Sequence, residues 1–184
     1  MFPFVRLAKE LIKFNNAPDM DMGDVHVSHH ICWPWDLDMF FELNNGRSLS
    51  LYDLGRLPMA RRSGFLKLIR QQGWGMSMAG ATVRWRHRVT LFQRFEMRSG
   101  ALGRDARFLY LHQTMWRKGR ALSSVIYRVA VTDKNGIVDT QRVADAMGIP
   151  EWDPQMPEWV MLWAKSEDSR PWPPVFDTPE ASQN

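Results

Sequence analysis

The chain has 184 residues, of which 24 are Lys or Arg and 20 are Asp or Glu, giving a formal net charge of +4. This length allows one domain with a substantial core, and two full domains would be a tight fit, so we predict a single domain over residues 1–184. The charges are too evenly balanced to require a nucleic-acid partner. The single Cys32 excludes an intrachain disulfide framework and favours a reducing compartment.

The sequence contains no run of about 18 consecutive apolar residues, which a membrane-spanning helix needs. The N-terminal region also lacks the uninterrupted apolar stretch and the small-residue cleavage site of a signal peptide. We therefore expect a cytoplasmic protein.

Residues 1–15 predict an amphipathic helix, with Arg6, Lys9, Glu10 and Lys13 on its charged side. The opposite side carries an apolar stripe made of Phe4, Val5, Ala8, Leu11 and Ile12. We expect this stripe to pack on the core of the protein or on a partner subunit. The alternative is peripheral contact with a membrane surface.

Residues 15–24 are rich in Asn, Asp, Pro and Gly and predict a loop, and residues 25–33 alternate as a strand that Pro34 ends. This strand contains His26, His29, His30 and Cys32, which suggest a metal site. Along a strand, however, His26 and His30 lie roughly 13 Å apart, and His29 points to the opposite face. We therefore predict no metal site here.

The strand leads into residues 36–46, which read Asp-Leu-Asp-Met-Phe-Phe-Glu-Leu-Asn-Asn-Gly. Asp36 and Asp38 stand between Trp33-Pro34-Trp35 and Phe40-Phe41. Such neighbours keep water away from a carboxylate and make it a better base, so one interpretation is a base that activates water. Short acids also hold turns and cap helices, and a structural role is the alternative.

Residues 46–72 predict one long helix or two shorter ones, with Pro58 and Gly64 as breaks and Gly73 at the end. Alternating runs at 81–89, 91–99, 107–117 and 121–132 then predict four strands joined by turns as an antiparallel meander. Together these elements predict an α+β fold in which an antiparallel sheet wraps around a central long helix, with a core over about residues 22–135. Residues 136–184 predict a C-terminal extension: a short helix to Met147, a Pro-rich bend, a second helix to about Asp168, and a tail.

This order of elements resembles the hotdog-fold thioesterases, the family of the 4-hydroxybenzoyl-CoA and acyl-acyl carrier protein thioesterases, over about residues 22–135. Members of that family carry Asp-x-Asp, often a His, and Asn-Asn before the central helix. The matching positions here are Asp36, Asp38, Glu42, Asn44 and Asn45. The helix stretch 52–56 (Tyr-Asp-Leu-Gly-Arg) and the strand 81–88 also resemble family signatures.

The resemblance implies a hydrolase for acyl-CoA or acyl carrier protein thioesters that needs no metal or redox cofactor. It makes Asp38 the general base or nucleophile. Thioester hydrolysis also needs N–H donors for the oxyanion, and the start of a helix near Asn44, Asn45 and Gly46 supplies them, with Gly46 allowing close approach. Asn45 is also placed to position the water.

Glu42 departs from the family pattern, because many relatives have His at this position. A carboxylate there acts as a second base, or it repels Asp38 from four residues away. A solvated side chain near the start of a helix is the alternative. The competing functional hypothesis is therefore a non-catalytic acyl or acyl-CoA binding protein of the same fold.

Arg84, Arg86 and Arg88 are expected on one face of the strand 81–89, with further arginines on the neighbouring strand 91–99. One interpretation is a surface that binds the phosphates of coenzyme A or an acidic carrier protein. A solvated sheet face is the alternative. Trp85 falls on the opposite face, so the stacking platform of a nucleic-acid binder is missing and we expect no nucleic-acid partner.

Apolar side chains are plentiful, and a few are candidates for lining an acyl tunnel: Met76, Met78, Phe95, Met97 and the pair Phe40-Phe41. Ordinary core packing accounts for most of them. Exposed sheet edges in this fold favour pairing across a two-fold axis, so we expect a homodimer or a dimer of dimers. The family resemblance implies sites near the subunit interface.

Overall fold

A computed structural model describes residues 2–174 of the chain. The chain divides into two compact units, Met1–Pro154 and Gln155–Asn184, which we describe separately. One domain over 1–184 remains a prediction. Residues 175–184 of the expected tail lie outside the described residues.

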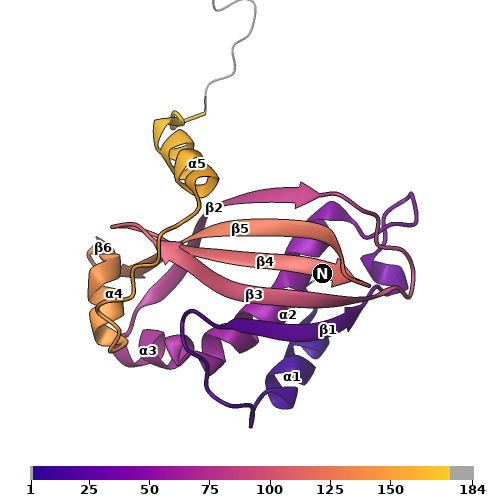
Figure 1. The fold of residues 1–184 in the computed structure, drawn as a ribbon, viewed down its shortest axis with the longest axis horizontal. Helices are drawn as coiled ribbons and strands as arrows, with labels where there is room; N and C mark the ends of the chain where they lie inside the picture. The colour runs from indigo at the N-terminus through magenta and orange to yellow at the C-terminus, as the bar shows by residue number, and fades with distance from the viewer. Residues whose placement is uncertain (1, 175–184) are drawn as a thin grey trace, which may run out of the picture. The chain divides into compact units, whose positions relative to one another are not determined.

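The first unit is built on one antiparallel sheet (Figure 1). Its strands are β1 (Val25–Ile31), β2 (Gly75–Trp85), β3 (Arg94–Arg104), β4 (Leu109–Arg117), β5 (Arg120–Asp133) and the short β6 (Gly136–Ile137). The order across the sheet is β1-β3-β4-β5-β2, and β6 pairs with β5. Strands β1 and β2 therefore lie at opposite edges.

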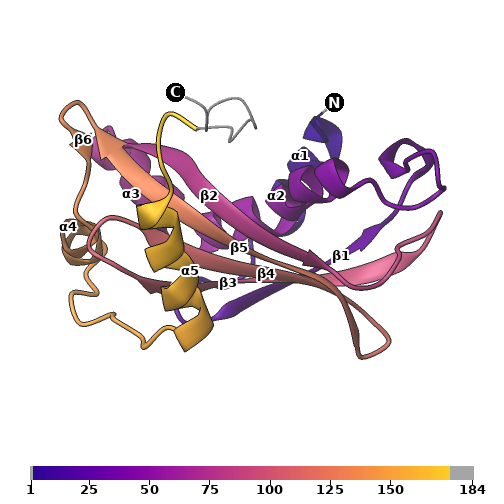
Figure 2. The ribbon, with the colours of Figure 1, turned by 90° about the horizontal axis from the view of Figure 1, so that it is seen from above.

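Helix α2 (Asn45–Arg62) runs along one face of this sheet, as the two views show (Figures 1 and 2). Leu51, Tyr52 and Leu54 of the helix are completely buried. They share one core cluster with sheet residues such as Met97 and Val125. This arrangement confirms the predicted α+β fold of a sheet wrapped around a long helix.

Strands β3, β4 and β5 form the expected meander, but β2 does not pair with β3. It crosses to the far edge and pairs with β5, where Val83 lies opposite Val125. β1 takes the place beside β3. The prediction of four consecutive neighbours was wrong here, because alternation reveals the two faces of a strand but not which strands lie beside it.

β1 turns its polar side towards the core. His26, Ser28 and His30 are buried, whereas the valines of the strand are exposed. The Nε2 atom of His30 lies 2.8 Å from the hydroxyl of Ser28, and the Nδ1 atom of His26 lies 3.1 Å from a guanidinium nitrogen of Arg62. Burial lowers the pKa of His26 to about 4 and that of His30 to about 3, so both rings are neutral at pH 7.

Two helices occupy the segment 46–72, which was expected to form either one long helix or two shorter ones. Gly64 stands between α2 and α3 (Phe65–Gln72), and Gly73 ends α3 with a left-handed φ of 63°. Pro58 lies inside α2 and is buried, so the expected break there was wrong. A proline ring removes one N–H donor from the helix, and burial of the ring against the core offsets that loss.

Helix α1 (Phe4–Lys13) confirms the predicted N-terminal helix, but its orientation differs from the expectation. Glu10 on the charged side is buried, whereas most of the apolar stripe is exposed. The expectation that the stripe packs on the core of the protein was wrong for Phe4, Val5 and Ile12. Arg6 and Glu10 face inward because Arg6 pairs with the buried carboxylate of Asp36, whereas Lys9 and Lys13 remain exposed.

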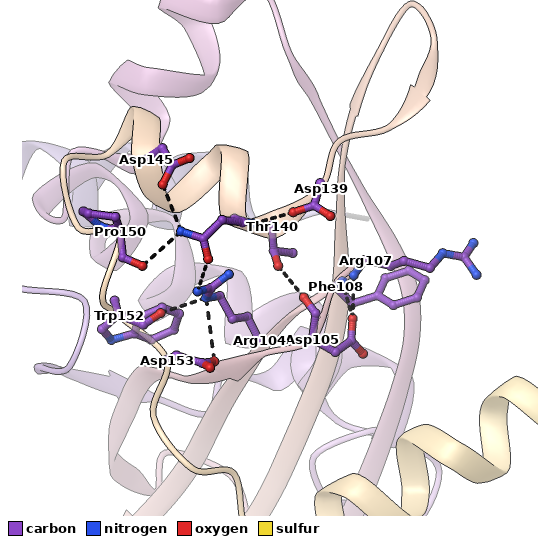
Figure 3. A network of polar contacts seen from close by, with 11 residues as sticks. Arg104, Asp105, Arg107, Phe108, Asp139, Thr140, Asp145, Pro150, Trp152 and Asp153 are labelled. Atoms are coloured by element: carbon purple, nitrogen blue, oxygen red, sulfur yellow. Dashed lines mark hydrogen bonds and ion pairs between the residues drawn. The ribbon is translucent and has the colours of Figure 1, made fainter.

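Helix α4 (Thr140–Ala146) and the loop after it are tied to the end of β3 by a polar network (Figure 3). Arg104 donates from Nε to the carbonyl of Trp152 at 2.8 Å and from Nη2 to the amide oxygen of Gln141 at 2.6 Å. Gln141 in turn donates to the carbonyl of Pro150 at 3.0 Å. None of the residues labelled in Figure 3 belongs to the motif 36–46, so we assign this network a structural role.

The second unit contains α5 (Glu158–Ser169), which confirms the helix expected to end near Asp168. Across residues 2–174, none of the helices has both the length and the apolar character needed to cross a membrane.

Candidate active site

Asp36 ends η1, a short 3-10 helix (Pro34–Asp36), and its side chain is completely buried. The Nε atom of Arg47 lies 2.7 Å from one carboxylate oxygen, and Nη1 of Arg6 lies 2.7 Å from the other. The backbone N–H of Trp33 also donates to the second oxygen, at 3.1 Å. Both oxygens are therefore occupied, as a structural carboxylate requires.

Asp38 holds a tight turn. Its Oδ1 atom accepts the backbone N–H groups of Phe40 at 2.8 Å and of Glu42 at 3.3 Å, and its own N–H donates to the carbonyl of Glu42 at 2.8 Å. Phe41 within the turn adopts a left-handed φ of 58°. No residue of the described chain binds the Oδ2 atom of Asp38. The turn thus fixes the direction of the carboxylate and leaves one oxygen available.

Glu42 pairs with a cation. Its carboxylate lies 3.1 Å from the Nε atom of Arg88, whose side chain is exposed. Exposed pairs of this kind contribute little to stability, about 0.5 kcal/mol, but this one gives Glu42 a positive neighbour in addition to the nearby acid Asp38.

Helix α2 begins directly after this turn. Asn44 is its N-cap: the side-chain oxygen accepts the N–H of Arg47 at 2.9 Å, and the N–H of Asn44 donates to the carbonyl of Asp36 at 2.9 Å. The backbone N–H groups of Asn45 and Gly46 donate to no acceptor within residues 2–174. Both residues are exposed. Unpaired amides at the positive end of a helix dipole attract an anion or a developing oxyanion.

A cleft of about 210 Å³ opens between the start of α2 and the segment after β2. Of the expected site residues, Glu42, Asn45, Arg86 and Arg88 line it. Asp38, Asn44, Gly46 and Arg84 are absent from its lining. The structure therefore brings together one part of the expected site, while Asp38 stands on the adjoining turn.

The three arginines do not share one strand face, contrary to the expectation. β2 ends at Trp85, and the N–H groups of Arg86 and His87 both donate to the carbonyl of Leu122, at 2.9 Å and 3.1 Å. Because two successive N–H groups share one carbonyl acceptor, the side chains here no longer alternate between the two faces of the sheet. Arg84 therefore lies within β2 and outside the cleft lining, whereas Arg86 and Arg88 follow the end of the strand and line the cleft.

Two polar residues of the cleft were not singled out from the sequence. His87 lines the cleft. The alternating pattern of the sequence placed it on the same strand face as several apolar residues, so nothing there marked it as a site residue. Ser123 also lines it, and its hydroxyl lies 2.8 Å from that of Tyr52. Burial raises the pKa of Tyr52, which keeps this hydroxyl protonated. No local sequence signal marks Ser123, because strand pairing alone carries it to the site.

A second, apolar cavity of about 250 Å³ lies between α2 and the strands β2, β4 and β5. Met76 and Met78 line it as expected for an acyl tunnel, whereas Phe95 and Met97 belong to the core. The ion pair of Asp53 and Arg56 stands in its wall.

The histidines of β1 do not gather around a common point with other ligands. His29 is exposed and lies 3.8 Å from the carboxylate of Glu96. In the part of the chain that the structure describes, no group of three or more His, Cys, Asp or Glu side chains is arranged to hold a metal ion.

Comparison with known proteins identifies the family of the chain. The model of the thioesterase-like superfamily matches residues 32–176, and the chain belongs to that superfamily. The predicted resemblance to the hotdog-fold thioesterases is thereby confirmed, since the similar solved structures include thioesterases of this fold.

Among individual relatives, Protein THEM6 of Xenopus laevis is 29% identical over 170 residues, which cover 90% of this chain and 80% of the relative. Protein THEM6 of Drosophila melanogaster is 24% identical over 143 residues, covering 76% and 72%. Among solved structures, the YbaW probable thioesterase of Escherichia coli has a TM-score of 0.63 at 12% identity and covers 70% of this chain and 99% of its own. The DHNA-CoA thioesterase of Staphylococcus aureus has a TM-score of 0.57 at 11% identity, covering 78% and 91%. At these identities the solved structures show the fold alone.

Proposed function

We propose that this protein is an acyl-CoA thioesterase in which Asp38 is the general base or nucleophile. The observation that carries the proposal is the combination of a fixed carboxylate with one unoccupied oxygen and the unpaired N–H groups of Asn45 and Gly46, on a turn that leads directly into α2. The first group activates or replaces water, and the second stabilises the charge that develops on the carbonyl oxygen.

The reaction follows from these roles. The Oδ2 atom of Asp38 takes a proton from water as the water oxygen attacks the thioester carbon, or it attacks that carbon itself. The carbonyl oxygen becomes an oxyanion that accepts the N–H groups of Asn45 and Gly46. Collapse of this intermediate breaks the carbon–sulfur bond, and in the general-base route the departing thiolate takes the proton held by Asp38. In the nucleophile route the thiolate leaves an anhydride between the acyl group and Asp38, which a water molecule then hydrolyses to free the carboxylic acid and Asp38. Asn45 holds the attacking water by its side-chain amide.

The substrate is an acyl thioester of coenzyme A or of an acyl carrier protein. Arg86 and Arg88 rim the cleft and offer guanidinium groups to phosphate oxygens. Arg84, outside the cleft, contributes to the same positive surface. The apolar cavity beside Met76 and Met78 offers room for an acyl chain.

The proposed enzyme is a homodimer formed through β2. This strand is 11 residues long, its side chains are mostly exposed, and it lies at an edge of the sheet, so one row of its backbone N–H and C=O groups has no partner strand. Long exposed edges of this kind pair with another copy of the same strand. A dimer of dimers is an extension of the same arrangement.

The alternative is a non-catalytic acyl or acyl-CoA binding protein. The observation in its favour is the ion pair of Glu42 with Arg88, at a position where many hotdog-fold relatives have His. The guanidinium of Arg88 occupies the carboxylate of Glu42, which makes this carboxylate less available as a second base. The ion pair of Glu42 and Arg88 offers the cleft polar groups that can hold a ligand, but not the imidazole that many relatives have at this position.

Hydrolysis and binding measured together distinguish the two functions. Thiol release is followed over a series of acyl-CoA chain lengths, while binding of a non-hydrolysable acyl-CoA analogue is measured by calorimetry. The thioesterase proposal expects release well above the rate without protein for at least one chain length. Tight binding of the analogue without release at any chain length would establish the alternative.

A further inference from the structure

Helix α1 exposes apolar side chains that a soluble surface normally buries. Phe4 is 70% exposed, Val5 is 85% exposed and Ile12 is 76% exposed. They lie on one side of the helix, at spacings that keep them together. Lys9 and Lys13 are exposed beside them.

The turn that carries Asp38 exposes a second apolar group. Met39 is 82% exposed, Phe40 is 71% exposed and Phe41 is 76% exposed, at the tip of the turn. Trp35, just before the turn, is 65% exposed and stacks on Trp33 with ring centroids 5.5 Å apart. Large exposed apolar groups on a folded domain mark a contact surface.

One ion pair fixes helix α1 to the segment that leads into the turn. Arg6 of α1 donates from Nη2 to the carbonyl of Ile31 at 3.0 Å, and its Nη1 atom lies 2.7 Å from the carboxylate of Asp36. Asp36 is buried and directly precedes the turn. The exposed stripe of α1 is therefore fixed relative to Trp35 and the tip of the turn, and we call the two groups together the apolar face.

We propose that the apolar face docks on the surface of a bilayer that contains anionic lipid. Aromatic and aliphatic side chains flanked by lysines are the composition that binds at the boundary between headgroups and acyl chains. Lys9 and Lys13 pair with lipid phosphates and anionic headgroups, and the net charge of +4 adds long-range attraction.

The sheet order argues against a second copy of the chain as the occupant. The proposed dimer uses β2, whereas α1 is anchored to the end of β1, and β1 and β2 are opposite edges of the sheet. Contact between two copies through α1 would also bring lysines of the same charge together. A negatively charged bilayer satisfies both the apolar and the basic parts of the face.

Docking in this way specifies a class of substrate, a step that rests on the proposed function. The turn of Asp38 would lie at the headgroup level, where long-chain acyl thioesters partition from water. We infer that the substrates are long-chain acyl thioesters taken from the membrane surface rather than short-chain ones in solution.

Co-sedimentation with vesicles tests the docking without any substrate, so its result is separate from that of the hydrolysis assay. The full chain is mixed with vesicles of phosphatidylcholine, or of phosphatidylcholine with phosphatidylserine. We expect binding to the second kind, and about tenfold weaker binding for the variant with Phe4→Ser, Val5→Ser and Ile12→Ser and for the variant with Met39→Ser and Phe40→Ser. Ile137→Ser, an exposed apolar position on β6, is the matched control and should bind as the wild type does.

Charge is tested in the same way. Lys9→Gln with Lys13→Gln should weaken binding to the phosphatidylserine vesicles, whereas Lys67→Gln with Lys134→Gln, which removes the same charge elsewhere, should weaken it less. Thermal unfolding confirms that each variant is folded. The proposal fails if the wild type does not bind these vesicles, or if the variants of the apolar face bind as tightly as their controls. It also fails if sedimentation without lipid shows that the α1 variant has lost a subunit contact.

Discussion

Asp36 and Asp38 are only two residues apart, but Asp36 has both carboxylate oxygens bound by arginines and Asp38 keeps one oxygen unoccupied. The difference arises because η1 turns Asp36 into the interior, where Arg6 and Arg47 meet it, and the next turn brings Asp38 back towards the surface. One acid therefore holds the structure while the other is presented for chemistry.

Asp36→Asn should destabilise the protein strongly. The amide cannot pair with Arg6 and Arg47 as a carboxylate does, and removing the acid from a buried ion pair costs about 3 kcal/mol. Denaturant unfolding measures this loss. Asp38→Asn is the comparison and should cost about 1 kcal/mol or less, because an amide oxygen still accepts the two N–H groups of the turn. Equal losses at the two positions would contradict the assignment.

Phe41→Gly should stabilise the turn. A residue other than glycine at a φ of 58° carries about 1 kcal/mol of strain, and the exposed ring at this position has little packing to lose. We expect a gain of about 0.5 kcal/mol after the extra entropy of glycine in the unfolded chain. Phe40→Gly, at a neighbouring position without a left-handed φ, should instead lower stability. Thermal unfolding of both variants checks the difference in sign.

Stability should fall as the solution is acidified below about pH 6.5. Burial lowers the pKa of His26 to about 4 and that of His30 to about 3, so the unfolded chain binds protons that the folded chain does not. Their contribution is fully present above the unfolded pKa and is lost as the pH falls towards the folded values, by about 2 kcal/mol for each histidine between pH 7 and pH 5.

Glu10 opposes this trend, because burial raises its pKa above the ordinary value despite the nearby lysines and arginine. Its protonation therefore favours the folded state as the pH falls.

Unfolding followed between pH 7 and pH 5 tests the histidine prediction. His30→Gln should lose less stability over this range than the wild type does. His29→Gln, at an exposed position of the same strand, should leave the pH dependence as in the wild type.

Ala81→Lys should weaken the proposed dimer. Ala81 is an exposed residue of β2, and charged side chains on an edge strand oppose pairing with a second copy. Analytical ultracentrifugation should show a dimer dissociation constant about tenfold higher than that of the wild type. Val25→Lys, on the edge strand β1, should leave the dimer intact. A monomeric wild type would contradict the proposed assembly.

Local patterns predicted the positions of most helices and strands, because periodicity and turn residues act over a few positions. Gly64 and Gly73 marked helix ends correctly, since a left-handed conformation is a local demand. The family pattern identified the fold from the motif at 36–46. Those signals are contained in short stretches of sequence.

The rest depends on partners that are distant in the sequence. The pairing of β2 with β5 is a non-local choice, and alternation contains no information about it. The orientation of α1 follows from Arg6 meeting Asp36, 30 positions away, which overrides the hydrophobic pattern of the helix. His87 and Ser123 reach the cleft in the same non-local way.

The rate of thiol release by Asp38→Asn tests the central claim most directly. With a long-chain acyl-CoA that the wild type hydrolyses, we expect release to fall about 100-fold or more while binding of a non-hydrolysable analogue is unchanged. Asp19→Asn, an exposed acid outside the motif, is the matched control and should release thiol as the wild type does. Wild-type rates in Asp38→Asn would contradict the assignment of Asp38 as base or nucleophile.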